Sequence, residues 1–215
     1  RAQAAYELKP EMASLNMGSI NLNLRELSTR ERNWKYDWEK KFLESTSGLV
    51  FRNTYDDIEW SINEIGIKGG TRFEFECYDI GHLYTLHYFL ERGLIKAPLF
   101  IQSVFGLRGG IGAHPEDVIH MKRTADRLFG DNYRWSVLAA GVNQMRIATM
   151  AALMVANVRV GLEDSLYIGH RQLAVSNAQQ VIKIRGLLEN LGLEIASPEE
   201  AREILDLKGK DAVAF

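Results

Sequence analysis

Cysteine is almost absent from this chain, which holds only Cys77 in 215 residues. An intramolecular disulfide and a zinc site built from several cysteines are both excluded, and the composition favours a reducing cytoplasm. No apolar run approaches the roughly 20 residues that span a bilayer, so we expect no membrane partner. The net charge of -2 gives no electrostatic reason for binding nucleic acid.

Histidine motifs that build metal sites are also missing. None of the five histidines belongs to an HxH or HExxH motif, so no metal site complete in itself can be read from the sequence. The sequence starts at Arg1 rather than at methionine, and we expect further residues before it.

Strands and helices alternate along most of the chain. Hydrophobic periodicity and the cap and stop residues predict these elements: strands at 11–15, 72–78, 98–104, 134–139 and 158–161; helices at 54–65, 81–91, 115–129, 143–152 and 175–190, with a short helix after Ser197. Repeated βα units indicate a parallel sheet, for which a barrel and a doubly wound sheet are the usual solutions.

We favour the barrel. A (β/α)₈ TIM barrel typically needs about 250 residues, so this chain would supply roughly the C-terminal five βα units as a single domain over residues 1–215. Within it, residues 24–50 are highly charged and fit neither a strand nor a core helix, so we expect an insertion there. Trp34 and Trp38, four residues apart, could pack against a neighbouring subunit of a homo-oligomer or onto their own domain.

Polar side chains gather where the predicted strands end, which is where a barrel builds its active site. Alternation places Glu74 and Glu76 on one face of their strand, opposite Phe73, Phe75 and Cys77. The candidates for substrate contacts at these ends are Ser14, Asn16, Ser19, Gln102 and Arg108.

The loop 106–112 is rich in glycine but has neither the Walker lysine nor the GxGxxG spacing. It is typical of a flexible βα loop over a site, where Arg108 could contact an anionic cofactor.

The most informative stretch is 157–164, where a strand pattern ends in Glu163 and Asp164, with Arg159 shortly before them. Charges at the end of a buried strand are costly unless they bind a metal, a substrate or each other. One acid could ligate a metal while the other acts as a base that Arg159 keeps ionised. A purely structural ion pair between Arg159 and either acid is the alternative.

Five segments together resemble the β-keto acid cleavage enzymes, a family that includes the 3-keto-5-aminohexanoate cleavage enzyme. They are residues 9–22, 73–79, 102–106, 140–144 and 158–164. The resemblance covers nearly the whole chain apart from residues 24–50, and the order and spacing of the segments make it specific.

The resemblance implies a zinc-dependent barrel that condenses a β-keto acid with acetyl-CoA to give acetoacetate and a new acyl-CoA. It implies Glu163 as a zinc ligand, with two histidines of an HxH motif expected upstream of Arg1. It also implies Asp164 as the base paired with Arg159, Glu76 as a pocket acid, and Ser14 or Asn16 in the substrate site. Zinc would polarise the keto oxygen of the substrate.

The sequence allows two other functions. The same barrel could be a different metal-dependent aldolase or lyase that does not use CoA. The missing histidines also allow a catalytically inactive barrel with a binding role. The sequence does not identify the β-keto acid.

Overall fold

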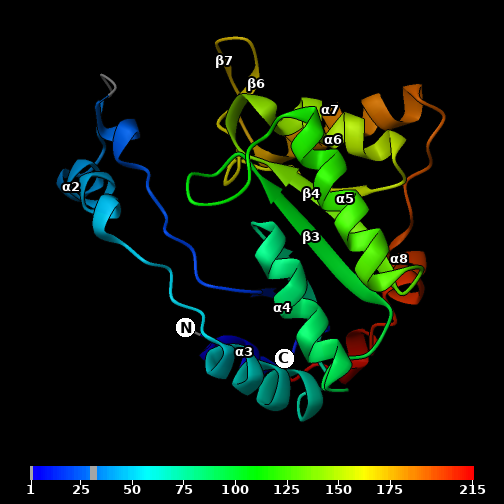
Figure 1. Cartoon of the computed structure of the whole chain (residues 1–215). Helices are drawn as coiled ribbons and strands as arrows, with labels where there is room; N and C mark the ends of the chain where they lie inside the picture. Colours follow the sequence, from blue (N-terminus) through cyan, green and yellow to red (C-terminus); the bar gives the residue numbers. More distant parts are fainter. Residues whose placement is uncertain (1, 30–32) are drawn as a thin grey trace.

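The computed structural model describes residues 2–29 and 33–215 of the chain. Its centre is a sheet in which five strands lie in chain order, and all four pairings are parallel (Figure 1). The strands are β1 (Met12–Asn16), β2 (Arg72–Cys77), β3 (Leu99–Phe105), β4 (Tyr133–Ala139) and β5 (Asn157–Val158). This order is the one expected of five successive units of a (β/α)₈ barrel, so the predicted α/β fold class is confirmed.

Helices connect the strands and cover one face of the sheet (Figure 1). They are α3 (Tyr55–Ser61), which continues as a π-helical turn over Ile62–Ile67, α4 (Ile80–Glu91), α5 (Pro115–Phe129) and α6 (Gln144–Leu153). The chain begins with α1 (Gln3–Leu8) and ends with α7 (Asn177–Asn190) and α8 (Pro198–Leu205). The α8 start follows its sequence signal, since Ser197 and Glu200 form a capping box and Pro198 occupies the first turn.

The hydrophobic core lies between the sheet and these helices. Alternate strand residues such as Phe73, Phe75 and Cys77 face α3, α4 and α5, and they are at most 6% exposed. Strand alternation therefore sends Glu74 and Glu76 to the opposite, inner face of the sheet, as predicted.

The end of the sheet at β5 differs from the prediction. A strand over 158–161 was expected, but the ladder includes only Asn157–Val158. Beyond it, the N–H groups of Asp164 and Ser165 donate to the Gly161 carbonyl, so the chain closes into a turn instead of extending the strand. A hairpin of β6 (Tyr167–Gly169) and β7 (Gln172–Leu173) follows, which the periodicity did not predict.

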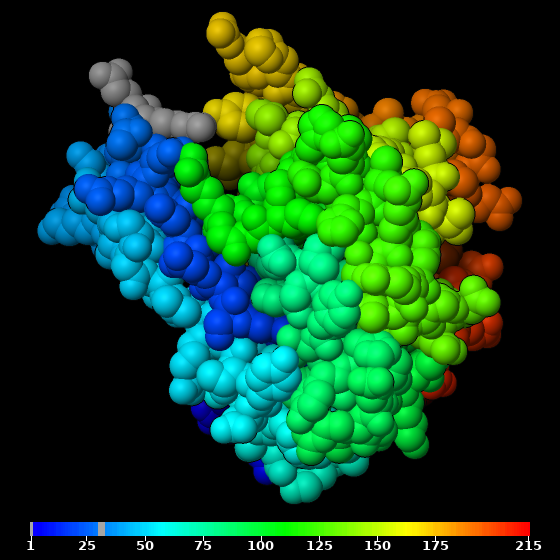
Figure 2. Space-filling model, viewed as in Figure 1, coloured from blue at the N-terminus to red at the C-terminus, as the bar shows by residue number. Residues whose placement is uncertain are grey.

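The charged segment 24–50 contains α2 (Asp37–Ser45), which has no buried residue and packs on the short helical turns at either side of it. Trp38 is 61% exposed and stacks on Tyr36 at 6.2 Å between ring centroids. In Figure 2 the blue and cyan surface of this segment bulges from one side of the molecule. Its description as an insertion stays a prediction.

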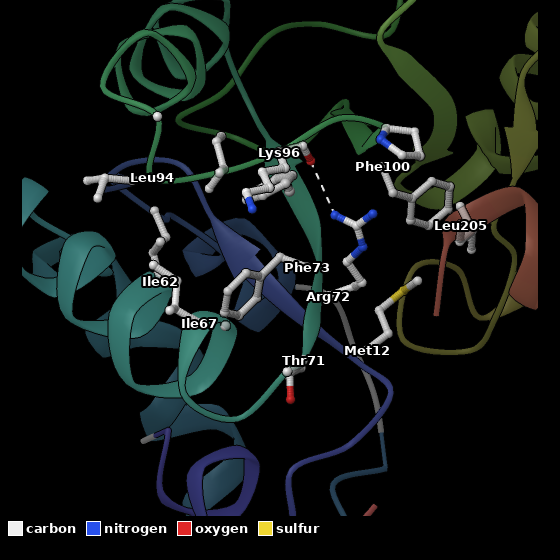
Figure 3. A pocket seen from close by; sticks show the side chains of 16 residues that line it. Met12, Ile62, Ile67, Thr71, Arg72, Phe73, Leu94, Lys96, Phe100 and Leu205 are labelled. Atoms are coloured by element: carbon white, nitrogen blue, oxygen red, sulfur yellow. Dashed lines mark hydrogen bonds between the residues drawn. The ribbon is translucent and has the colours of Figure 1, made fainter. Parts of the chain in front are cut away.

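A cavity of about 400 Å³ opens at the amino ends of the strands, between the helical turn at Ile67 and the segment before β3 (Figure 3). Its lining is mostly apolar, and the Arg72 guanidinium donates there to the Lys96 carbonyl at 3.2 Å. In a barrel this end stabilises the fold, and the active site lies at the opposite, carboxyl ends of the strands. No helix in the described residues is long and apolar enough to cross a membrane.

Candidate active site

Arg159, just beyond β5, lies at the centre of a cluster of carboxylates. Its Nε and Nη2 donate to the two oxygens of Asp164 at 3.1 and 3.2 Å, a bidentate pair. Its Nη1 donates to Glu76 at 3.2 Å and lies 3.9 Å from Glu74, while Nη2 also donates to Glu163 at 3.0 Å. The Arg159 guanidinium therefore forms ion pairs with four acids, of which two lie on β2 and two in the turn after β5.

Three of these acids are shielded from water and the fourth is not. The side chains of Asp164 and Glu76 are each 9% exposed and that of Glu74 is 16% exposed, whereas that of Glu163 is 84% exposed. The sequence left open a structural ion pair between Arg159 and either acid, and both ion pairs are present. Asp164 faces the inner cluster, and Glu163 extends into solvent at its rim.

Burial shapes the protonation of the cluster. It raises the pKa of Glu74, of Glu76 and of Asp164 above their ordinary values, although nearby hydrogen bonds and Arg159 oppose the shift. For Arg159 itself, burial lowers the pKa, but Asp164 and the neighbouring glutamates outweigh that effect and raise it. Carboxyls with raised pKa values beside a fixed cation are typical of sites that exchange protons with a substrate.

Replacing Glu74 by glutamine is expected to stabilise the protein near neutral pH. Because the pKa of Glu74 is raised in the folded state above its ordinary value of 4.5, folding costs free energy once the pH exceeds that value and approaches the folded pKa. Glutamine removes this cost and still accepts from Ser14. We expect Tm at about pH 7.5 to rise by roughly 2–4 °C, which corresponds to about 1 kcal/mol in a domain of this size.

The gain should disappear at about pH 3, well below the ordinary pKa of 4.5, where this glutamate is protonated in both the folded and the unfolded state. Differential scanning calorimetry at both pH values tests this, with Glu194→Gln at an exposed position as the control. A Tm that falls equally at both pH values would contradict the prediction.

Polar side chains of β1 and of Tyr78, the residue after β2, extend the cluster. The Ser14 hydroxyl donates to Glu74 at 3.0 Å, and the Tyr78 hydroxyl donates to Glu76 at 2.9 Å. Asn16 lies beside Glu76 in the β1–β2 register. Sequence reasoning did not single out Tyr78, although its place two residues after Glu76 on the same strand face was an available signal.

The other predicted substrate contacts, Gln102, Ser19 and Arg108, have different hydrogen-bond partners. Gln102 lies beside Glu76 in the β2–β3 register and is fully buried, and its amide nitrogen and oxygen have no partner among the described residues. Ser19 instead accepts from the Asn53 backbone N–H at 2.9 Å. Arg108 donates to Glu26 at 2.6 Å, which ties the glycine-rich loop to the charged segment 24–50.

That loop is seated closely against the end of the sheet. Ile111 N–H donates to the Tyr78 carbonyl at 2.7 Å. At Gly109, whose φ is +99°, a Cβ atom would lie 2.1 Å from the Asn21 carbonyl oxygen, so only glycine fits. The loop therefore lies over the connections that follow β1 and β2, on the side of the cluster.

The residues present do not by themselves make a zinc site. Across residues 2–29 and 33–215, no three His, Cys, Asp or Glu side chains are grouped so that they could hold a metal ion. Glu163 is exposed and close to the cluster, so it is a single candidate ligand among the described residues.

Comparisons with known proteins identify the family of this chain. A family model described as beta-keto acid cleavage enzyme matches residues 1–207. The chain is 57% identical over 209 residues to a 3,5-dioxohexanoate:acetyl-CoA acetone transferase of Paraburkholderia graminis, covering 97% of this chain and 67% of that protein. It is 32% identical to a 3-keto-5-aminohexanoate cleavage enzyme of Fusobacterium nucleatum, covering 94% of this chain and 63% of the relative.

A solved structure, the apo form of ObcA, has a TM-score of 0.67 at 16% identity and covers 92% of this chain and 44% of its own, which supports the fold alone. The chain spans about two thirds of the length of the two curated relatives named above. The family model and the two relatives cover nearly all of it, and the chain belongs to the β-keto acid cleavage enzyme family.

Proposed function

We propose that the whole protein transfers an acyl group from a β-keto acid to CoA. In the overall exchange, the bond between the keto carbon and the methylene of the acid breaks, and the methylene joins the acetyl carbon of acetyl-CoA to give acetoacetate. The CoA sulfur leaves that acetyl group and takes the remaining acyl group. Family membership supports the proposal, and the observation that carries it is the bidentate Arg159–Asp164 pair inside a shielded carboxylate cluster.

Asp164 is the proposed base. The methylene between a carboxylate and a ketone is acidic, and a carboxylate with a raised pKa is a suitable acceptor for its proton. Arg159 holds both oxygens of Asp164 and so orients the group. Glu76, clamped between Arg159 and Tyr78, is the proposed pocket acid that relays protons beside it.

Substrate contacts come from the inner face of the sheet in this proposal. Ser14 and Asn16 lie next to the cluster, and the unpaired amide of Gln102 offers a donor and an acceptor to a bound molecule. A buried amide that lacks a partner costs free energy, which a ligand would recover by pairing with it. Ser19 and Arg108 remain candidates at the rim, where Arg108 would suit an anionic group of CoA.

The relative from Paraburkholderia graminis makes 3,5-dioxohexanoate the first substrate to test. The purified whole protein is mixed with acetyl-CoA and each of 3,5-dioxohexanoate, 3-keto-5-aminohexanoate and 3-oxoadipate, and acetoacetate and acyl-CoA are measured. We expect the highest kcat/KM for 3,5-dioxohexanoate. Turnover without acetyl-CoA would favour an aldolase or lyase, and no turnover with any acid would favour a binding protein.

Zinc is the proposed cofactor, with Glu163 as one ligand and the remaining ligands from residues outside this sequence. Glu163→Ala is expected to lower the zinc content of the whole protein to less than about a tenth of wild type, because loss of a ligand weakens a metal site strongly. Elemental analysis after dialysis measures this, with Glu194→Ala as the control. Unchanged zinc in Glu163→Ala would remove Glu163 from the proposed ligand set.

A homo-oligomer is also part of the proposal. The exposed aromatic side chains Tyr36, Trp38 and Phe42 of the charged segment support it, because exposed apolar surface marks association sites. The cytoplasmic location favoured by the single cysteine stays a prediction.

A further inference from the structure

The turn Gly161–Ser165 carries Glu163 and Asp164, and other parts of the chain hold its backbone from several sides. The Gln144 amide donates to the Gly161 carbonyl at 2.9 Å, and the Gln180 amide donates to the Ser165 carbonyl at 2.7 Å. The Leu162 N–H donates to Asn177 Oδ1 at 2.7 Å. The Gly141 N–H adds a bond to the Asp164 carbonyl at 2.7 Å.

The two glutamines bond in the same way. Gln144 is 1% exposed and Gln180 is fully buried. In each, the amide nitrogen donates to the turn, while the Oε1 atom has no partner in the part of the chain that the structure describes. Burying an unpaired carbonyl oxygen is unfavourable, so an apolar side chain would suit these positions better if packing were their only role.

The helices that carry these side chains, α6 and α7, pack against each other. Gln144 begins α6, and Asn177 and Gln180 lie in the first turns of α7. The two helices pack through Ala148, Ala152, Ile184 and Leu188, all buried. Side chains on packed helices hold a site more precisely than a free loop does.

We propose that Gln144, Asn177 and Gln180 are positioning residues for the acidic turn. They fix the carbonyls and the N–H on both sides of Glu163 and Asp164, so that Asp164 meets Arg159 and Glu163 extends to the rim. The inference rests on the proposed function only for its kinetic readout. The holding of the turn can be measured without any activity.

The test compares Gln144→Met and Gln180→Met with Gln179→Met in the whole protein. Methionine keeps the length and volume of glutamine but cannot donate. Gln179 neighbours Gln180, and its Oε1 accepts from Val175 N–H rather than from the turn, so it controls for losing a hydrogen bond from α7.

With 3,5-dioxohexanoate and acetyl-CoA, we expect kcat to fall about 10- to 100-fold in the two test variants, because small misplacements of a catalytic group cost about this much. KM should stay within about twofold of wild type, since the substrate contacts lie elsewhere, and Gln179→Met should keep the wild-type kcat.

Hydrogen exchange gives the readout that is independent of turnover. The amides of residues 161–165 should exchange at least about 10-fold faster in Gln144→Met and Gln180→Met than in Gln179→Met. If the wild-type protein shows no turnover but the exchange changes as expected, the proposed function fails and the positioning role stands. Unchanged exchange, or wild-type kcat in both variants, overturns the positioning role.

Asn177 supplies a second pair of variants that do not disturb the core, because its side chain is exposed. Asn177→Asp keeps an oxygen that accepts from Leu162 and should retain kcat within about threefold, whereas Asn177→Leu should lose about 10-fold. Equal kcat in the two variants would remove Asn177 from the set. If the glutamine variants fail to fold, this pair and its exchange rates at residues 161–165 decide the proposal in the same way.

Discussion

Asp164→Asn is expected to lower kcat/KM for acetoacetate formation by about 10³-fold, within the 10²- to 10⁴-fold range that a positioned general base contributes. Asparagine has nearly the size of aspartate and can still accept one hydrogen bond from Arg159, so the turn and the cluster should keep their shape. What it cannot do is take a proton from the substrate. The loss should therefore appear mainly in kcat, as expected for a group that acts in the transition state.

Two controls test whether the loss of activity is specific to Asp164 and independent of the zinc content. Asp131→Asn, at an exposed position between α5 and β4, should leave both kcat and KM unchanged. The zinc content of Asp164→Asn should equal that of wild type, in contrast to Glu163→Ala, because Asp164 is engaged with Arg159 and is nearly buried. Equal loss of metal in both variants would contradict the division of roles between the two acids, and retained turnover would exclude Asp164 as the base.

The strands and most helices could be predicted because their signals are local. The run Phe73, Phe75 and Cys77 alternates with charged residues, and the structure buries this set against α4 as the period of two requires. The start of α5 follows from Pro115 in the same way. The strand at β5 was predicted too long, over 158–161, because Val158 and Val160 look like strand residues. The hydrogen bonds of the following turn, which the pattern does not encode, end the ladder at Val158.

The site was predictable as far as strand ends determine it. Arg159 and Asp164 could be paired from their spacing, and Glu76 could be placed from its face of β2. The pairing of the Arg159 guanidinium with four acids could not be predicted, because Glu74 and Glu76 are more than 80 positions away from it in the chain. The roles of Gln144 and Gln180 could not be predicted either. A glutamine in a helix is usually on the surface, and the sequence does not show that these two are buried.

Arg159→Met should reduce stability as well as activity. Removing one partner of a buried pair costs about 3–5 kcal/mol, and since the Arg159 side chain is 27% exposed, water screens part of this and we expect a loss of about 2 kcal/mol near neutral pH. In a domain of this size, that lowers Tm by about 4–8 °C. Turnover should fall at least about 10³-fold, because Asp164 loses the cation that orients it.

The pH dependence separates this electrostatic cause from a simple loss of packing. Burial already raises the pKa of Asp164 and of Glu76, and without Arg159 both should rise further, because the charge that favours the ionised forms is gone. At about pH 3, below the ordinary pKa values of 3.8 and 4.5 for Asp164 and Glu76, protonation removes the repulsion between these carboxyls, and Tm should approach that of wild type. Arg134→Met, which removes an exposed arginine on the neighbouring strand β4, is the matched control and should shift Tm by less than about 2 °C at either pH. If the loss of Tm in Arg159→Met is the same at both pH values, Arg159 contributes packing rather than charge. The buried acids of the cluster would then have to be stable in their ionised form without a compensating cation, which the free-energy cost of buried charge opposes.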